Sequence, residues 1–123
     1  MDHLVPPMAD QHPMYEAITT ATLIAAHTER LRIGHLVLCD AMREAPVLAK
    51  QAVTLDHASG GRFELGLGWG SVPQELVDFG ITTDGPKARA VRMAATLATL
   101  RDCWAGRQQP TPLSRIPIVI GGS

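Results

Sequence analysis

The 123-residue sequence lacks an excess of charge of either sign and lacks any long hydrophobic run. Eleven basic residues against twelve acidic ones give a formal charge of −1, and no basic stripe is present to attract nucleic acid or an anionic membrane. No stretch approaches the roughly 18 consecutive apolar residues of a membrane span, and no basic segment with an apolar run opens the chain. These absences argue against nucleic-acid and membrane partners and predict a cytoplasmic protein.

Cysteine is scarce, and motifs for metals and nucleotides are missing. The two cysteines, Cys39 and Cys103, form no CxxC pair, which argues against a zinc or redox motif and predicts free thiols in a reducing compartment. The histidines have no recognisable ligand spacing, so no metal site is predicted. There is no P-loop, and counted from Gly66 the sixth position of a dinucleotide fingerprint is Ser71 instead of glycine.

The sequence does contain a regular alternation of helical and strand patterns. Helical apolar spacing marks residues 15–29, 46–58, 74–78 and 87–104, and β-rich apolar segments mark residues 31–39, 62–70 and 116–120. Such alternation predicts right-handed crossovers and a parallel sheet. The strands that begin at Leu31 and Arg62 start 31 residues apart, which matches one of eight units in a barrel of about 250 residues. We therefore predict an α/β fold with three parallel strands and their helices, a single domain over residues 1–123.

Turn-forming residues agree with these boundaries. Pro46 suits the first turn of a helix, where its missing N–H costs nothing, and Ser59-Gly60-Gly61 can take positive φ where that helix ends. The apolar residues that we expect to face the core are Leu48, Ala49, Ala52, Val53 and Leu55 in this helix and Val91, Ala94, Leu97, Leu100 and Trp104 in the long one.

The strand over residues 62–70 has two unlike faces. Bulky Phe63, Leu65, Leu67 and Trp69 alternate with Arg62, Glu64, Gly66, Gly68 and Gly70. Bare backbone at the end of a strand would leave a flat space in which a planar group could approach closely. Tight packing against a neighbouring element explains the glycines equally well. Both interpretations stay open at this point.

Three charged residues lie around this strand. Asp56 and Arg62 flank the Ser-Gly-Gly turn, and we expect them to form a structural pair or to contact helix ends. Glu64 lies on the glycine face and needs a partner or a function if it is buried.

The two ends of the sequence predict an incomplete barrel. The chain begins with a loop where a strand is expected, and it ends directly after the strand at residues 116–120. A partial barrel leaves sheet edges unpaired and apolar helix faces uncovered. We therefore expect a homo-oligomer or association with a complementary chain.

The ordered landmarks of the chain resemble the bacterial luciferase-like family of flavin- or deazaflavin-dependent oxidoreductases. These landmarks are Asp2-His3, His27–Gly34, Ala45–Lys50, Leu55-Asp56, Ser59–Phe63, Leu65–Gly70, Glu75, Phe79-Gly80 and Ile116–Gly122. They span essentially the whole chain in order. The resemblance implies a (β/α)8 TIM barrel of roughly twice this length or more, of which this chain follows the second strand through the end of the fifth.

The resemblance also implies where a cofactor would bind. In such enzymes the ring of FMN or of a deazaflavin (coenzyme F420 type) lies at the C-terminal mouth of the barrel. His3 matches a histidine near the ring, and the third-strand exit often contains a bulge with a non-proline cis peptide. The implied cofactor-binding residues are Leu36, Val37 and Cys39 at the third-strand exit, Gly68, Trp69, Gly70 and Ser71 at the fourth, and Gly121, Gly122 and Ser123 at the start of a phosphate-binding loop.

Several of these residues have a simpler interpretation. His3 is either a proton donor or acceptor or a solvated terminal histidine. Trp69 either stacks on a ring or packs in the core. Members of the family that oxidise sugar phosphates have an acidic residue near the position of Ser71. The lack of that acidic residue here argues against sugar phosphates as the substrate class.

Three functions follow for comparison. The first is an oxidoreductase acting on a small organic substrate, with oxygen chemistry in the flavin branch and hydride transfer in the deazaflavin branch. The second is an inactive truncated barrel fragment that must associate with another chain or copy. The third is a non-redox barrel enzyme in which the terminal glycines hold a phosphate, and it leaves the ordered landmarks unexplained.

Overall fold

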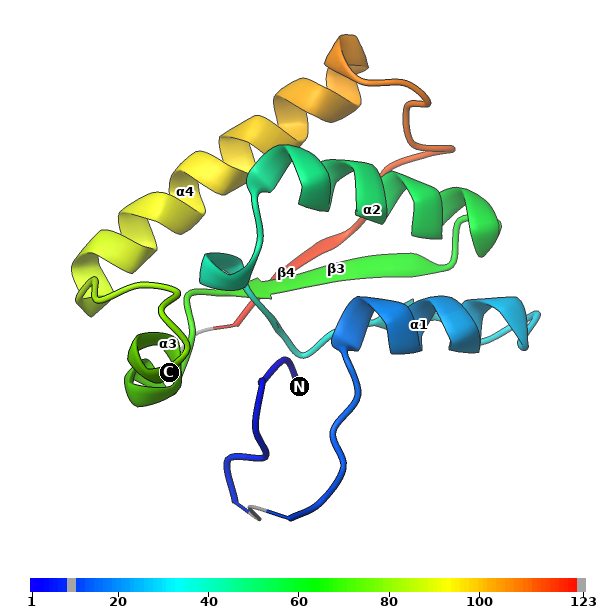
Figure 1. The fold of residues 1–123 in the computed structure, drawn as a ribbon. Helices are drawn as coiled ribbons and strands as arrows, with labels where there is room; N and C mark the ends of the chain where they lie inside the picture. Colours follow the sequence, from blue (N-terminus) through cyan, green and yellow to red (C-terminus); the bar gives the residue numbers. More distant parts are fainter. Residues whose placement is uncertain (9–10, 122–123) are drawn as a thin grey trace.

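The computed structural model describes residues 1–8 and 11–121 as one layer of helices on a small parallel sheet (Figure 1). Its strands are β1 (Ile33–Gly34), β2 (Leu38–Cys39), β3 (Phe63–Gly68) and β4 (Ile118–Ile120). Its helices are α1 (Ala17–Ala26), α2 (Ala45–Ala58), α3 (Pro73–Asp78) and α4 (Pro86–Asp102), with a 3-10 turn η1 (Asp40–Met42) and a π-helical segment η2 (Cys103–Arg107). The predicted alternation of helices and strands is confirmed.

The long strand β3 is the centre of the sheet. Both β1 and β2 pair with one edge of β3, and β4 pairs with the other edge, all in parallel. This arrangement confirms the predicted parallel α/β sheet, and it brings the carboxyl ends of β2, β3 and β4 to the same end of the molecule.

The predicted strand over residues 31–39 is wrong as a continuous element. Ile33 pairs with Phe63, thirty residues on, whereas Leu38 pairs with Leu67, twenty-nine residues on. One extra residue therefore lies between β1 and β2, which makes residues 35–37 a bulge. The peptide bond between Leu36 and Val37 in this bulge is cis, as the family resemblance implied.

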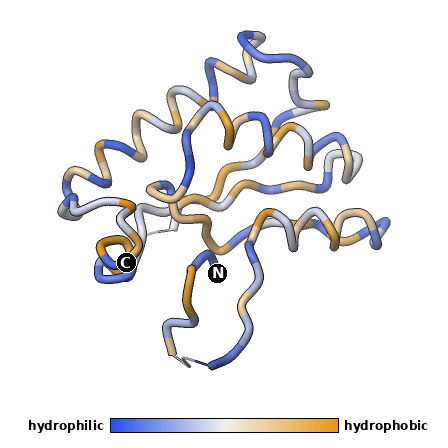
Figure 2. The backbone as a smooth tube through the Cα atoms, viewed as in Figure 1, coloured by the Kyte–Doolittle hydropathy of each residue, from blue (hydrophilic) through white to orange (hydrophobic). Residues whose placement is uncertain are grey.

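The core lies between the sheet and helices α1, α2 and α4. Phe63, Leu65 and Leu67 of β3 are almost fully buried in it, and hydrophobic residues recur along β3 and α1 in Figure 2. Helix α2 begins with its proline at the first turn, as predicted, and Gly60 and Gly61 follow it with φ of 65° and 82°. The predicted stripe of α2 is buried.

The predicted buried face of α4 is partly wrong. Val91 and Ala94 are exposed, whereas Arg89, Met93, Thr96 and Leu100 are buried. The first half of α4 packs over η1, where the buried carboxylate of Asp40 faces Arg92 and Thr96. The buried face of this half of the helix therefore includes polar residues, which hydrophobic spacing alone does not indicate.

Helix α1 begins later and ends earlier than predicted, with Glu16 as its N-cap and His27 as its C-cap. The Arg62 guanidinium donates hydrogen bonds to the carbonyls of Ala25 (3.1 Å) and Thr28 (2.8 Å), on either side of the last helical residue, Ala26. Asp56 accepts the Leu113 N–H at 2.8 Å. The predicted helix-end contact is confirmed for Arg62, whereas Asp56 contacts a loop, which was not predicted.

Glu64 is a partly exposed residue near the start of β3, and its carboxylate has a partner. Its carboxylate lies 2.5 Å from Nε of Arg32. Within the described residues, no helix is both long and apolar enough to cross a membrane.

Candidate functional site

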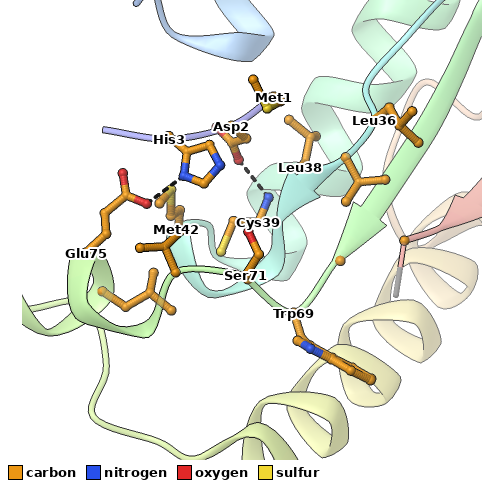
Figure 3. A pocket seen from close by; sticks show the side chains of 16 residues that line it. Met1, Asp2, His3, Leu36, Leu38, Cys39, Met42, Trp69, Ser71 and Glu75 are labelled. Atoms are coloured by element: carbon orange, nitrogen blue, oxygen red, sulfur yellow. Dashed lines mark hydrogen bonds and ion pairs between the residues drawn. The ribbon is translucent and has the colours of Figure 1, made fainter. Parts of the chain in front are cut away.

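A pocket of about 300 Å³ lies at the carboxyl ends of the parallel strands (Figure 3). Four separate segments form it: the first three residues, the bulge with β2 and η1, the exit of β3 through α3, and Gly121 after β4. In α/β barrels this end of the sheet is the one that carries active sites. The volume is at the lower end of the range for small-molecule pockets.

The structure brings together the predicted site residues that it describes. Those that line the pocket are His3, Leu36, Val37, Cys39, Gly68, Trp69, Gly70, Ser71 and Gly121. Gly122 and Ser123, predicted to begin a phosphate-binding loop, lie outside the described residues.

The glycine face of β3 is occupied by a side chain of the bulge. A Cβ on Gly68 would lie 2.7 Å from a methyl group of Val37, and one on Gly121 would lie 2.6 Å from the same methyl group. A Cβ on Gly66 would lie 1.7 Å from the carbonyl oxygen of His35. The expectation of an empty flat space on bare glycine backbone is therefore wrong. The glycines accommodate the bulge, and the wall offered to a ligand is Val37 together with Leu36, whose side chain is 76% exposed.

His3 is held in the pocket by Glu75. Its Nδ1 lies 2.8 Å from Oε2 of Glu75, and the side chains are only 12% and 4% exposed. The other Glu75 oxygen accepts the backbone N–H groups of Leu4 and Val5. The interpretation of His3 as a solvated terminal histidine is therefore wrong.

The environment of Glu75 sets the role of each His3 nitrogen. Burial raises the pKa of Glu75, but hydrogen bonds from His3, Val5 and Leu4 outweigh burial and hold its pKa below the ordinary value. An ionised carboxylate can only accept, so Nδ1 of His3 carries the hydrogen in this contact. In neutral His3, Nε2 is then the nitrogen that can accept a proton.

We expect the Glu75 contacts to make stability depend on pH. Because the pKa of folded Glu75 is lowered, its contribution is fully present above its ordinary value of 4.5 and is lost as pH falls through the folded pKa. At pH 7, Glu75→Gln should lower the free energy of unfolding by about 1.5–3 kcal/mol, because hydrogen bonds to a charged group are lost. In urea denaturation, this difference should narrow below pH 4.5.

The exposed residue Asp102 gives the control for that experiment. Asp102 pairs with Arg107 at the surface, and Asp102→Asn should change stability little at any of these pH values. A Glu75→Gln deficit that stays constant from pH 7 to pH 3 would contradict the prediction.

Cys39 and Trp69 contribute to the pocket in different ways. Burial raises the pKa of the Cys39 thiol, which keeps it protonated and a poor nucleophile. A Cβ on Gly70 would lie 3.1 Å from the Cys39 sulfur, so this thiol closes one side of the cavity. Trp69 packs against the core, next to α4 in Figure 3, which favours the core interpretation over ring stacking.

Sequence reasoning assigned no role to several residues of the site. Glu75 was one of the family landmarks, yet its contact with His3 spans 72 positions. Asp2 is adjacent to His3 and accepts hydrogen bonds from the Cys39 N–H (2.7 Å) and from Arg43. Among the residues that the structure describes, no three His, Cys, Asp or Glu side chains are grouped as metal ligands.

A parallel α/β sheet with a pocket at the carboxyl ends of its strands is typical of α/β enzymes, both barrels and open doubly wound sheets. The model of the luciferase-like monooxygenase family matches residues 2–123, and the chain belongs to that family.

Individual relatives agree with this assignment. The chain is 42% identical over 92 residues to the 4-hydroxyprotoasukamycin monooxygenase of Streptomyces nodosus subsp. asukaensis, a match that covers 75% of this chain and 23% of that protein. It is 30% identical over 138 residues to the F420-dependent glucose-6-phosphate dehydrogenase of Microbacterium testaceum, covering 99% of this chain and 41% of that protein.

The solved structures show a shared fold. A crystal structure described as an F420-dependent secondary alcohol dehydrogenase in complex with an F420-acetone adduct has a TM-score of 0.86 at 18% identity, over 98% of this chain and 42% of that one. The structural relatives are TIM-barrel enzymes, so the prediction of a partial TIM barrel is confirmed. The chain spans less than half the length of each of these relatives.

Proposed function

We propose that the pocket is part of the active site of a flavin- or deazaflavin-dependent oxidoreductase that acts on a small organic substrate. The observation that carries the proposal is the His3–Glu75 pair on one side of a cavity whose other side is the apolar Leu36–Val37 wall. A redox ring needs an apolar surface to lie against, and its substrate needs a group that can take or give a proton.

The residues present fit such a ring in a particular way. Leu36 offers its exposed side chain to the cavity, and Gly68 and Gly121, which have no side chains, leave room for Val37 beside it. The ring would therefore rest on the bulge side chains instead of on bare glycine backbone. When bound, it would supply the electron or hydride acceptor that no side chain can supply.

The residues of the chain would orient the substrate and handle the proton. His3 would accept the hydrogen of a substrate hydroxyl at Nε2, since Nδ1 is committed to Glu75. Glu75 would stabilise the resulting imidazolium through the same 2.8 Å contact. Met42, Val72 and Leu76 line the cavity beside this pair and would exclude water from it.

The relatives support both cofactor classes and do not choose between them. One solved relative, a monooxygenase, is described in complex with FMN, and another relative is named an F420-dependent dehydrogenase. For this chain we favour the deazaflavin branch with an alcohol as substrate, because His3 is placed for a hydroxyl proton. A serine instead of an acid at position 71 favours a substrate other than a sugar phosphate.

The alternative proposal is that the chain works only as part of an assembly. The outer edge of β4 has no strand beside it among the described residues, and Val119 and Ile120 are 42% and 50% exposed there. Unpaired apolar strands of this kind favour association with a second copy or a complementary chain. Sedimentation of the chain at several concentrations tests this, and a monomer at all of them counts against it.

A ring titration tests the main proposal. The 123-residue chain would be titrated with FMN and, separately, with deazaflavin, and binding followed by the shift of the ring absorbance. Leu36→Asp should weaken binding by about tenfold or more, because it replaces apolar contact with a charge that must be desolvated. The control Val91→Asp, at a 65% exposed position of α4, should leave binding unchanged.

Two outcomes would count against the proposed ring site. One is that neither ring binds the unchanged chain. The other is that Leu36→Asp and Val91→Asp bind the ring equally well.

A further inference from the structure

The segment that carries His3 is held without any strand pairing. Residues 1–5 belong to no helix or strand. They are held in place instead by two carboxylates at different points. Glu75 accepts hydrogen bonds from His3, Leu4 and Val5, whereas Asp2 extends from the segment to β2 and to Arg43.

Asp2 is the point at which the segment is attached to the sheet. Its carboxylate accepts the Cys39 N–H at 2.7 Å, at the end of β2. The same carboxylate accepts two hydrogen bonds from the Arg43 guanidinium, one of them 3.0 Å long. The Asp2 side chain is only 6% exposed, so these hydrogen-bond partners, and not water, stabilise its negative charge.

Arg43 is itself fixed by a third element. Its Nη2 donates to Glu16 at 2.7 Å, and Glu16 is the N-cap residue of α1, where its carboxylate also accepts the N–H groups of Ile18 and Thr19. Burial raises the pKa of Glu16, but these hydrogen bonds lower it to about 2, so Glu16 stays ionised beside Arg43. The Arg43 side chain, which is 12% exposed, therefore lies between two carboxylates that each also accept backbone N–H groups.

We propose that Arg43, acting through Asp2, is a positioning residue that fixes the His3 imidazole in the pocket. Its planar guanidinium holds the Asp2 carboxylate in two hydrogen bonds and ties it to the N-terminus of α1. Asp2 precedes His3 directly, so a fixed Asp2 limits where the imidazole can lie. Glu75 then sets the orientation of the ring but does not by itself hold the segment on the sheet.

The test measures His3 directly, in the 123-residue chain. The amide order parameter of His3 should lie near 0.85, the value for rigid backbone, and fall below about 0.6 in Arg43→Gln and in Asp2→Ala. The long-range nitrogen–proton spectrum of the imidazole should show Nδ1 protonated in the unchanged chain and lose that preference in both variants. Arg107→Gln, which removes an exposed arginine–aspartate pair, should change neither signal.

Asp2→Ala keeps the experiment decisive if Arg43→Gln does not fold, because it leaves the Arg43–Glu16 pair in place. An unchanged His3 order parameter in folded Asp2→Ala would overturn the proposal, even if that variant melts at a lower temperature. The role of His3 as a proton acceptor rests on the proposed function, but its positioning does not. If neither ring binds the chain but His3 becomes mobile in both Arg43→Gln and Asp2→Ala, the proposed oxidoreductase function is rejected and the positioning role of Arg43 is retained.

Discussion

Replacing Gly66 by alanine is expected to lower the free energy of unfolding by about 3 kcal/mol or more. The added Cβ would lie 1.7 Å from the carbonyl oxygen of His35 and 2.8 Å from its carbonyl carbon. Both atoms belong to the backbone of the bulge, so no rotation of a side chain can relieve the overlap. The bulge and the central strand would have to separate, with loss of hydrogen bonds on that edge.

Urea denaturation followed by circular dichroism measures this effect, with Gly85→Ala as the matched control. Gly85 has φ of −70° at the start of α4, and nothing lies within 4 Å of the position of its Cβ. Its substitution should cost less than about 1 kcal/mol. Equal stability of the two variants would show that β3 and the bulge are farther apart than described.

Removing the His3 imidazole is expected to reduce turnover by about 10²–10⁴-fold, the range for loss of a general acid or base. The assay would use His3→Ala with deazaflavin as acceptor and propan-2-ol as the test alcohol, following the loss of ring absorbance. The Kd of the ring should change by much less, because the apolar wall at Leu36 and Val37 is intact. A loss confined to kcat identifies a proton-transfer role.

Two comparisons make that result interpretable. His12→Ala alters an exposed histidine of a loop and should leave the rate unchanged. Low turnover in His3→Ala with an unchanged Kd for the ring would agree with His3 as the base. If His3→Ala kept full activity, His3 would have no part in the chemistry.

The arrangement of helices and strands was predictable because it depends on local patterns. The apolar stripe of α2, the glycines after it and the two-faced strand β3 are all visible within short windows of sequence. The pocket was predictable to the same extent, since parallel strands bring their carboxyl ends together whatever the side chains are.

The features that could not be predicted depend on contacts between residues far apart in the sequence. The bulge that divides the predicted strand at residues 31–39 is defined only by the pairing of Ile33 and Leu38 with β3. The partner of His3 lies 72 positions away, and nothing near either residue indicates the contact. Val37 fills the space over three glycines, which a pattern of alternating residues cannot distinguish from an empty space.

The extra residue between β1 and β2 separates residues that face the core from residues that face the cavity along one edge of the sheet. Ile33 and Leu38 both face the core, although an unbroken strand would send an odd-numbered and an even-numbered residue to opposite faces. The bulge absorbs that mismatch and turns Leu36 and Val37 toward the cavity. A change of side chain at Leu36 can consequently alter the wall of the cavity while Ile33 and Leu38 on either side keep their packing against the helices.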